Sequence, residues 1–111
     1  MNNLHLSVEA QNDLAEIKAY ITEELENPDA ALATISRITK KIRILKNQAY
    51  VGTSLSSVAD TESDYRFLVS GNYLVFYRAY GKDVYIDRVF YGRRDYMRIL
   101  FGDAQTDETD K

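Results

Sequence analysis

The chain has 111 residues, a formal net charge of −3 and no cysteine, which indicates one small domain and excludes disulfides and thiolate metal sites. Its single histidine, His5, argues against a Ser-His-Asp arrangement or a histidine metal cluster. The sequence contains no apolar run as long as a membrane span and no leader-like start, so we expect a cytoplasmic protein that uses no metal or cofactor.

The charges are divided into zones along the chain. Residues 1–30 contain seven acids and one lysine, whereas residues 31–58 contain five bases and no acid. Residues 65–102 contain seven bases against three acids, and the tail 103–111 is again acidic. The two basic zones are suited to contact nucleic acid or an acidic partner. The alternative is that they neutralise the acidic N-terminal zone inside the fold.

The N-terminal part of the chain predicts a strand followed by a helix. Leu4, Leu6 and Val8 alternate with polar residues, and we expect this short strand to pair within a sheet formed later in the chain. Residues 9–26 repeat apolar side chains at helical spacing and predict an amphipathic helix. The apolar positions of this helix are Ala10, Leu14, Ile17, Ile21 and Leu25.

A second helix is predicted to begin directly after the first. Asn27 can accept hydrogen bonds as its N-cap, Pro28 suits the first helical position, and Asp29 lies near the positive end of the helix dipole. The helical pattern fades near Asn47, and the two helices should form an antiparallel hairpin. The apolar stripe of this second helix is Leu32, Ile35, Ile38, Ile42 and Leu45.

The rest of the chain predicts a loop, three strands and a short helix. Residues 48–64 are rich in Gly, Ser, Thr and acids and indicate a long loop. Gly71 and Asn72 separate two alternating runs, which is the signal of a two-residue hairpin. A second turn falls at residues 81–83, and a helix begins near Arg93. The predicted fold class is α+β, in the order β-α-α-β-β-β(-α), with the helical hairpin packed on one face of a small, mainly antiparallel sheet.

The three strands also predict which residues share a face. The first turn places Arg66 opposite Tyr77, and a second turn of three residues then places Tyr77 opposite Asp87. The apolar face, which we expect the helices to cover, consists of Phe67, Val69, Leu74, Phe76, Val84, Ile86 and Phe90. The other face carries Arg66, Tyr73, Tyr77, Tyr85, Asp87 and Tyr91. A second turn of two residues would exchange the faces of the last strand.

The order of these elements, with YRFLVSGNYLVFYRA followed by VYIDRVFYGRRDYMRIL, resembles the RelE/ParE superfamily of toxins from bacterial type II toxin-antitoxin systems. The resemblance covers Leu4 to Phe101. It implies one toxin domain over residues 1–102, with an acidic, disordered tail at 103–111. It further implies a cytoplasmic growth inhibitor of the plasmid-stabilisation type that a cognate antitoxin silences within a hetero-oligomer.

One branch of this superfamily consists of metal-independent endoribonucleases that cut messenger RNA on the ribosome. The resemblance gives Arg66, Arg94 and Tyr96 the catalytic positions of that branch, with Arg93 as the alternative to Arg94. The branch also uses lysines before and within the second strand, but residues 48–65 contain no lysine and only acidic or neutral side chains. Phosphoryl-transfer chemistry requires cations and a proton donor, so this catalytic set is incomplete.

The ParE branch inhibits DNA gyrase without hydrolysis, and the run from Arg88 to Asp95 is more similar to it. In that case the target-binding residues are Tyr91, Arg93, Arg94 and Arg98. The basic second helix would then contact the antitoxin through Lys40, Lys41 and Arg43. A further alternative is a binding module that pairs with an antitoxin and has no toxicity.

Several of these residues also have structural interpretations. Arg66 can pair with Asp87 across the sheet, in which case it contributes only about 0–1 kcal/mol as an exposed ion pair. Arg88 can lay its stem on apolar surface and reach an acid of the first helix. Asp95 can cap the last helix, and the tyrosines can serve packing rather than base stacking.

Overall fold

The computed structural model describes residues 1–59, 62–92 and 95–102. The order of elements predicted from the sequence is confirmed, and the loop between α2 and β3 holds an additional short strand and a 3-10 turn. The elements are β1 (Asn3–Leu6), α1 (Val8–Ala19), the π-helical turn η1 (Tyr20–Glu24), α2 (Pro28–Ile44), β2 (Thr53–Ser54), the 3-10 turn η2 (Leu55–Ser57), β3 (Arg66–Ser70), β4 (Tyr73–Tyr80), β5 (Asp83–Tyr91) and α3 (Tyr96–Phe101).

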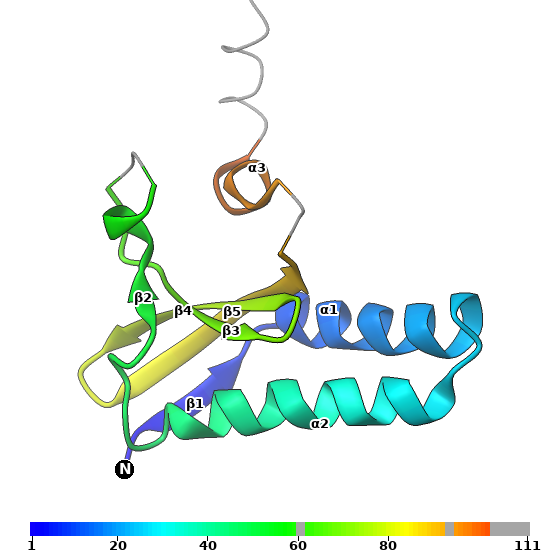
Figure 1. Cartoon of the computed structure of the whole chain (residues 1–111). Coiled ribbons are helices and arrows are strands. Elements are labelled where there is room, and N and C mark those ends of the chain that lie inside the picture. The colour runs from blue at the N-terminus through cyan, green and yellow to red at the C-terminus, as the bar shows by residue number, and fades with distance from the viewer. Residues whose placement is uncertain (60–61, 93–94, 103–111) are drawn as a thin grey trace, which may run out of the picture.

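The five strands form one mixed sheet in the order β1-β5-β4-β3-β2. The N-terminal strand β1 pairs parallel with the first half of β5, from Asn3 opposite Asp83 to Leu6 opposite Ile86. All other neighbours are antiparallel. The α1–α2 hairpin covers one face of this sheet, and its far end projects beyond the strands (Figure 1). The predicted α+β class is therefore confirmed.

The first helix is fixed to the sheet at its start and changes pitch near its end. The Ser7 hydroxyl accepts a hydrogen bond from the Ala10 N–H and donates one to the Asp87 carbonyl, so the helix cap also binds β5. After Ala19 the helix continues as the π-helical turn η1. A π-helical turn holds an extra residue and rotates the next residues around the helix axis. Leu25, predicted as a core position, is consequently 56% exposed.

The second helix begins as predicted, because the Asn27 side chain accepts a hydrogen bond from the Ala30 N–H and Pro28 occupies the first turn. Its buried face, however, differs from the predicted stripe at the N-terminal end. Leu32 is 59% exposed, because positions four and seven residues before Ile38 share the buried face of an α-helix. The residues buried on this side are Ala31, Thr34, Ile38, Ile42 and Leu45.

The predicted first hairpin turn at Gly71 and Asn72 is confirmed, with Arg66 opposite Tyr77. The second turn has two residues instead of three, since Tyr80 pairs directly with Asp83. Tyr77 therefore lies opposite Ile86, and the predicted pairing with Asp87 is wrong. The register shifts beside Phe76, which faces Arg88, so Asp87 is the extra residue of a β-bulge.

The predicted faces of the sheet are correct only in part, since Val84 and Ile86 lie beneath the helices as predicted but the phenylalanines do not. The face beneath the α1–α2 hairpin contains Tyr77, which is fully buried. Its sheet residues are Leu68, Val75, Tyr77, Val84, Ile86 and Val89. Phe67, Phe76 and Phe90 lie on the opposite face. The two-residue turn places Val84 and Ile86 on the face of Tyr77, and the bulge then places Phe90 on the face of Phe76.

This opposite face carries a second core beneath α3 and η2. Leu55, Phe76 and Phe90 are buried there, and Tyr65 and Tyr96 pack against them. Helix α3 lies on the far side of the sheet from α2 (Figure 1). Helix α3, which ends the C-terminal block (residues 91–102), is thus held in place by aromatic packing. None of the helices in the described parts of the chain combines the length and hydrophobicity needed to cross a bilayer.

Candidate partner-binding site

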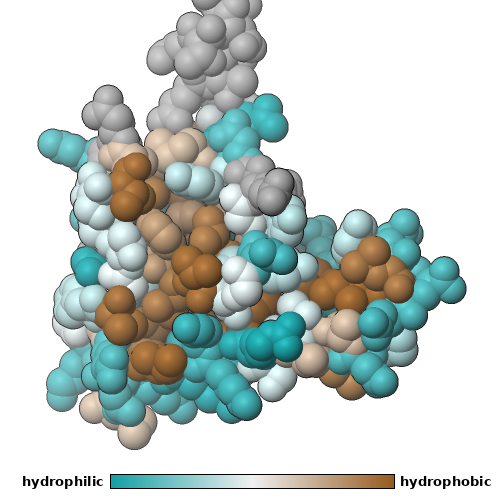
Figure 2. Space-filling view, in the orientation of Figure 1, coloured by the Kyte–Doolittle hydropathy of each residue, from teal (hydrophilic) through white to brown (hydrophobic). Residues whose placement is uncertain are grey.

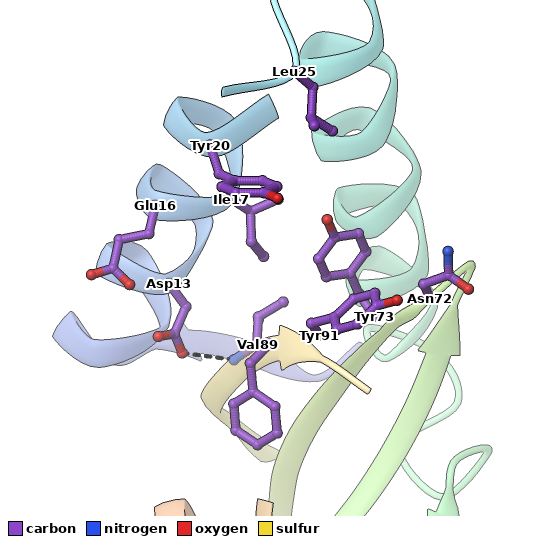
Figure 3. Close-up of a pocket in the computed structure, with 10 residues that line it drawn as sticks. Asp13, Glu16, Ile17, Tyr20, Leu25, Asn72, Tyr73, Val89 and Tyr91 are labelled. Carbon is purple, nitrogen blue, oxygen red and sulfur yellow. Dashed lines mark hydrogen bonds between the residues drawn. The ribbon is translucent and has the colours of Figure 1, made fainter. Parts of the chain in front are cut away.

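A groove with a volume of about 660 Å³ lies between the end of α1 and the end of β5 (Figure 3). One wall is helical, and the other consists of the β3–β4 turn and the last residues of β5. The groove is lined by Asp13, Glu16, Ile17, Tyr20, Leu25, Asn72, Tyr73, Val89, Phe90 and Tyr91. Its surface is mainly apolar and aromatic, and the charged side chains that line it are acidic.

Three tyrosines form the aromatic part of this groove. Tyr73 and Tyr91 are paired across β4 and β5, with ring centroids 5.9 Å apart and an interplanar angle of 68°. Tyr20 reaches toward them from η1 on the other wall, and its side chain is 56% exposed (Figure 3). Burial raises the pKa of Tyr73, and the neighbouring Tyr91 and Tyr20 add to this effect. The Tyr73 hydroxyl therefore stays protonated and can donate a hydrogen bond to a ligand.

Asp13 fixes the end of β5 to α1. Its carboxylate accepts hydrogen bonds from Arg88 Nε at 2.8 Å, from Arg88 Nη2 at 2.9 Å and from the Val89 N–H at 2.8 Å (Figure 3 marks the last). The hydrogen bond with Asp13 raises the pKa of Arg88. The prediction that Arg88 reaches an acid of the first helix is confirmed. Asp13 itself was not predicted as the partner of Arg88. A signal was present, because Asp13 lies at helical spacing between Ala10 and Ile17 and so falls on the buried stripe of the helix.

Among the described residues, no strand other than β4 pairs with β5 beside the groove. The Asp87 carbonyl and the Val89 N–H are bonded to Ser7 and Asp13, which leaves the end of β5 near Tyr91 for pairing. Pairing between β1 and β5 ends at Leu6 and Ile86. Beyond this point β5 runs on to Tyr91 with β4 as its neighbour on the other side. Such an edge can accept an added strand, since it offers backbone groups for further pairing.

The basic residues of α2 form a second hollow of about 270 Å³ on the other side of the β3–β4 turn. Lys40 and Lys41, predicted as antitoxin contacts, lie there together with Arg37. The hollow is lined by Arg37, Lys40, Lys41, Ile44, Ser70 and Gly71. Arg43, the third predicted contact, is exposed on the same helix but does not line this hollow.

The Arg66 side chain is hydrogen-bonded to the loop between α2 and β2. Its Nε and Nη2 donate to the Gly52 carbonyl at 3.2 and 2.8 Å, and Nη2 also donates to the Tyr50 carbonyl at 3.1 Å. The guanidinium carbon lies 5.4 Å from the centre of the Tyr50 ring. The predicted pairing of Arg66 with Asp87 is wrong, because Asp87 accepts a 2.7 Å hydrogen bond from Arg78.

The other predicted site residues belong to the C-terminal block. The Asp95 side chain accepts a hydrogen bond from the Arg98 N–H, so its predicted role as a helix cap is confirmed. Tyr96 packs against Phe76 with ring centroids 5.5 Å apart, whereas Arg98 is exposed on α3. Arg93 and Arg94 lie outside the described residues, as does the tail 103–111. Within the described ranges, no group of three or more His, Asp and Glu side chains is arranged to hold a metal ion.

A helical hairpin on a small mixed sheet, with an aromatic groove beside the last strand, defines a small α+β protein. The model of the family described as the ParE toxin of type II toxin-antitoxin systems, parDE, matches residues 4–96. The chain belongs to this family and is a toxin of the type II class.

Solved structures agree with this fold. A chain of the chromosomal ParDE toxin-antitoxin system from P. aeruginosa matches with a TM-score of 0.68 and 24% identity, over 82% of this chain and 96% of that one. YafQ from E. coli matches with a TM-score of 0.52 and 16% identity, over 92% of this chain and 100% of its own. A point mutant of YafQ matches with a TM-score of 0.53 and 14% identity, over 92% of this chain and 100% of its own. A comparison with the curated proteins finds no match.

Proposed function

We propose that this toxin inhibits DNA gyrase by binding, without hydrolysing a substrate, and that a cognate antitoxin neutralises it by covering the groove. Membership of the ParE family supports a binding mechanism. One observation favours the gyrase-inhibitor branch over the ribonuclease branch. The Arg66 guanidinium donates hydrogen bonds to the carbonyls of Tyr50 and Gly52.

A ribonuclease of this fold would need cations free to stabilise a charged phosphate. Nε and Nη2 of Arg66 donate to carbonyls of the loop, and Arg78 and Arg88 are paired with Asp87 and Asp13. Tyr96, a predicted catalytic residue of that branch, begins α3 and packs against the aromatic core beneath it. Arg66 and Tyr96, the two predicted catalytic residues that the structure describes, are therefore both engaged in contacts within the fold. This arrangement favours a structural role for Arg66.

The surface proposed to contact the target is the C-terminal block. Tyr91 is 40% exposed at the end of β5, and Arg98 is exposed on α3. Arg93 and Arg94 complete the proposed set from the sequence. The packing of α3 on Phe76 and Phe90 gives Arg98 a fixed platform, which reduces the entropy lost when a partner binds.

The groove is the proposed antitoxin site because its exposed apolar surface needs a partner. Leu25, which lines the groove, is more than half exposed, and Figure 2 shows apolar surface gathered at the far end of the α1–α2 hairpin, bordered by hydrophilic residues. Burial of such surface is the main source of affinity in protein association. A partner segment in the groove could also pair with the end of β5 near Tyr91.

Two assays on the purified full-length chain separate the candidate functions. Inhibition of gyrase supercoiling without cleavage of messenger RNA in a translating extract supports the proposal. Cleavage that disappears in the double variant Arg66→Ala with Tyr96→Phe would instead support the ribonuclease branch. If the chain shows neither activity and its induction leaves growth unchanged, it is a non-toxic antitoxin-binding module.

Arg98→Glu provides a sharper test of the proposed surface. Reversal of this exposed charge should weaken gyrase inhibition by about tenfold, as expected for a residue in a charged contact. Lys82→Glu is the matched control, because it makes the same change of charge at the exposed β4–β5 turn. Equal activity of the two variants would remove Arg98 from the target-binding surface.

A further inference from the structure

The groove and the basic hollow of α2 are adjacent, with one hairpin turn between them. Ser70 and Gly71 line the hollow, and the next two residues, Asn72 and Tyr73, line the groove. Consecutive Cα atoms are about 3.8 Å apart, so a ligand that crosses the β3–β4 turn moves directly from one depression to the other.

The two depressions carry opposite charges. Among the described residues, Asp13 and Glu16 line the groove without a basic residue, and because Asp13 is paired with Arg88, Glu16 supplies the net negative charge there. The exposed acids Glu23 and Glu24 lie further along, on η1. The tyrosine rings of the groove also favour a cation, which is attracted to the face of an aromatic ring.

The hollow beside α2 has the reverse character. Arg37, Lys40 and Lys41 line it without an acid, and Ile44, which is 41% exposed, adds an aliphatic contact. Its lining is thus three cations around an apolar centre. A polyanion such as DNA would be attracted here but repelled by Glu16 across the turn. A peptide with an aliphatic anchor between acids fits this hollow better than a phosphate backbone does.

We propose that a single segment of the antitoxin crosses the Gly71–Asn72 turn with an ordered change of charge. It places a lysine or arginine beside an apolar anchor in the groove, and acidic residues around an aliphatic anchor over α2. This inference rests on the proposed neutralisation by an antitoxin and specifies the chemistry of that partner. The charge order gives the complex one direction of binding, because the reversed segment would set like charges against each other at both ends.

The test uses the full-length toxin and, as its probe, the protein encoded by the reading frame beside the toxin gene. Affinity is measured by titration calorimetry. Glu16→Lys and the double variant Lys40→Glu with Lys41→Glu should each weaken binding by about tenfold or more. Glu62→Lys and Lys82→Glu make the same kinds of charge change on exposed residues remote from both depressions and should stay within about twofold of the unchanged chain.

A compensating pair completes the test. A probe variant in which lysines and arginines of the bound segment become glutamates, and its acids become lysines, should lose affinity for the unchanged toxin. It should regain affinity for the triple variant Glu16→Lys, Lys40→Glu and Lys41→Glu. Tight binding that no charge change affects, but that Tyr73→Ala abolishes, overturns the charge order and leaves antitoxin binding in the groove intact. If the probe does not bind the unchanged toxin at all, both proposals fail.

Discussion

Asp13 on α1 and Arg88 on β5 form a two-pronged ion pair that joins elements 75 residues apart in the chain. The Asp13 side chain is 8% exposed and that of Arg88 is 27% exposed. The same carboxylate also binds the Val89 N–H, so it satisfies a backbone donor at the strand edge that β1 does not cover. This contact joins the two walls of the groove, because Asp13 and Val89 both line it.

Asp13→Asn should lower the free energy of unfolding by about 2–3 kcal/mol. The amide cannot neutralise Arg88, although the partial exposure of Arg88 keeps the cost below that of a fully buried pair. Urea unfolding of the purified chain measures this change. Glu62→Gln, which removes an exposed carboxylate, should change the free energy by less than about 0.5 kcal/mol. A loss no larger than that of the control would mean that the pair contributes little.

The sequence predicts the elements well because their signals are local. Helical spacing, the Asn27–Pro28 start and the Gly71–Asn72 turn each act within a few residues, and the structure retains all of them. The faces of the sheet depend on a longer register. Two features decide which side chains of β5 lie on each face: the length of the β4–β5 turn and the bulge at Asp87. Neither feature has a distinct local signature in the sequence.

The same distinction applies to the candidate site. Arg88 could be assigned to an acid of the first helix, because a cation on an apolar strand needs a partner there. Two contacts could not be predicted: that Asp13 is the acid that binds Arg88, and that Arg66 binds the Gly52 carbonyl. Both depend on how segments distant in the sequence pack against each other. The groove also escaped prediction, because the π-helical turn that exposes Tyr20 and Leu25 has no sequence signal comparable to a cap.

Gly52→Ala should destabilise the fold by about 1–3 kcal/mol, because a Cβ at this position would overlap its neighbours. It would lie 2.6 Å from the Tyr77 hydroxyl oxygen and 2.7 Å from the Phe67 carbonyl oxygen. The Gly52 N–H also donates to the Tyr77 hydroxyl, so a shift of the loop would cost this buried hydrogen bond. Thermal unfolding measures the effect.

A double variant can separate the overlap with the Phe67 carbonyl from the overlap with the Tyr77 hydroxyl. Tyr77→Phe removes the hydroxyl but leaves the Phe67 carbonyl in place. The double variant Gly52→Ala with Tyr77→Phe should therefore remain less stable than Tyr77→Phe alone. Full recovery of stability in the double variant would show that the hydroxyl was the whole obstacle.

The stability of the chain should fall as the pH rises above 10. Burial raises the pKa of both Tyr65 and Tyr73 above the usual value of 10.0. A raised pKa in the folded state means that the unfolded chain loses its phenol protons first, so stability is fully present below pH 10 and decreases as the pH passes through the folded-state values. Urea unfolding at several pH values measures this slope, and Tyr73→Phe should reduce it. A slope unchanged in Tyr73→Phe would assign the effect to other groups.

Tyr20→Ala should weaken binding of the antitoxin without unfolding the toxin. The ring is 56% exposed in the free chain and lines the groove, so its loss removes contact area from the complex and little from the core. An aromatic anchor of this kind contributes about 2 kcal/mol, or roughly thirtyfold in affinity. Tyr80→Ala is the matched control, since Tyr80 is 45% exposed and lines neither the groove nor the basic hollow. In cells, the Tyr20 variant should still arrest growth but require more antitoxin for rescue, and rescue at the unchanged antitoxin level would exclude Tyr20 from the interface.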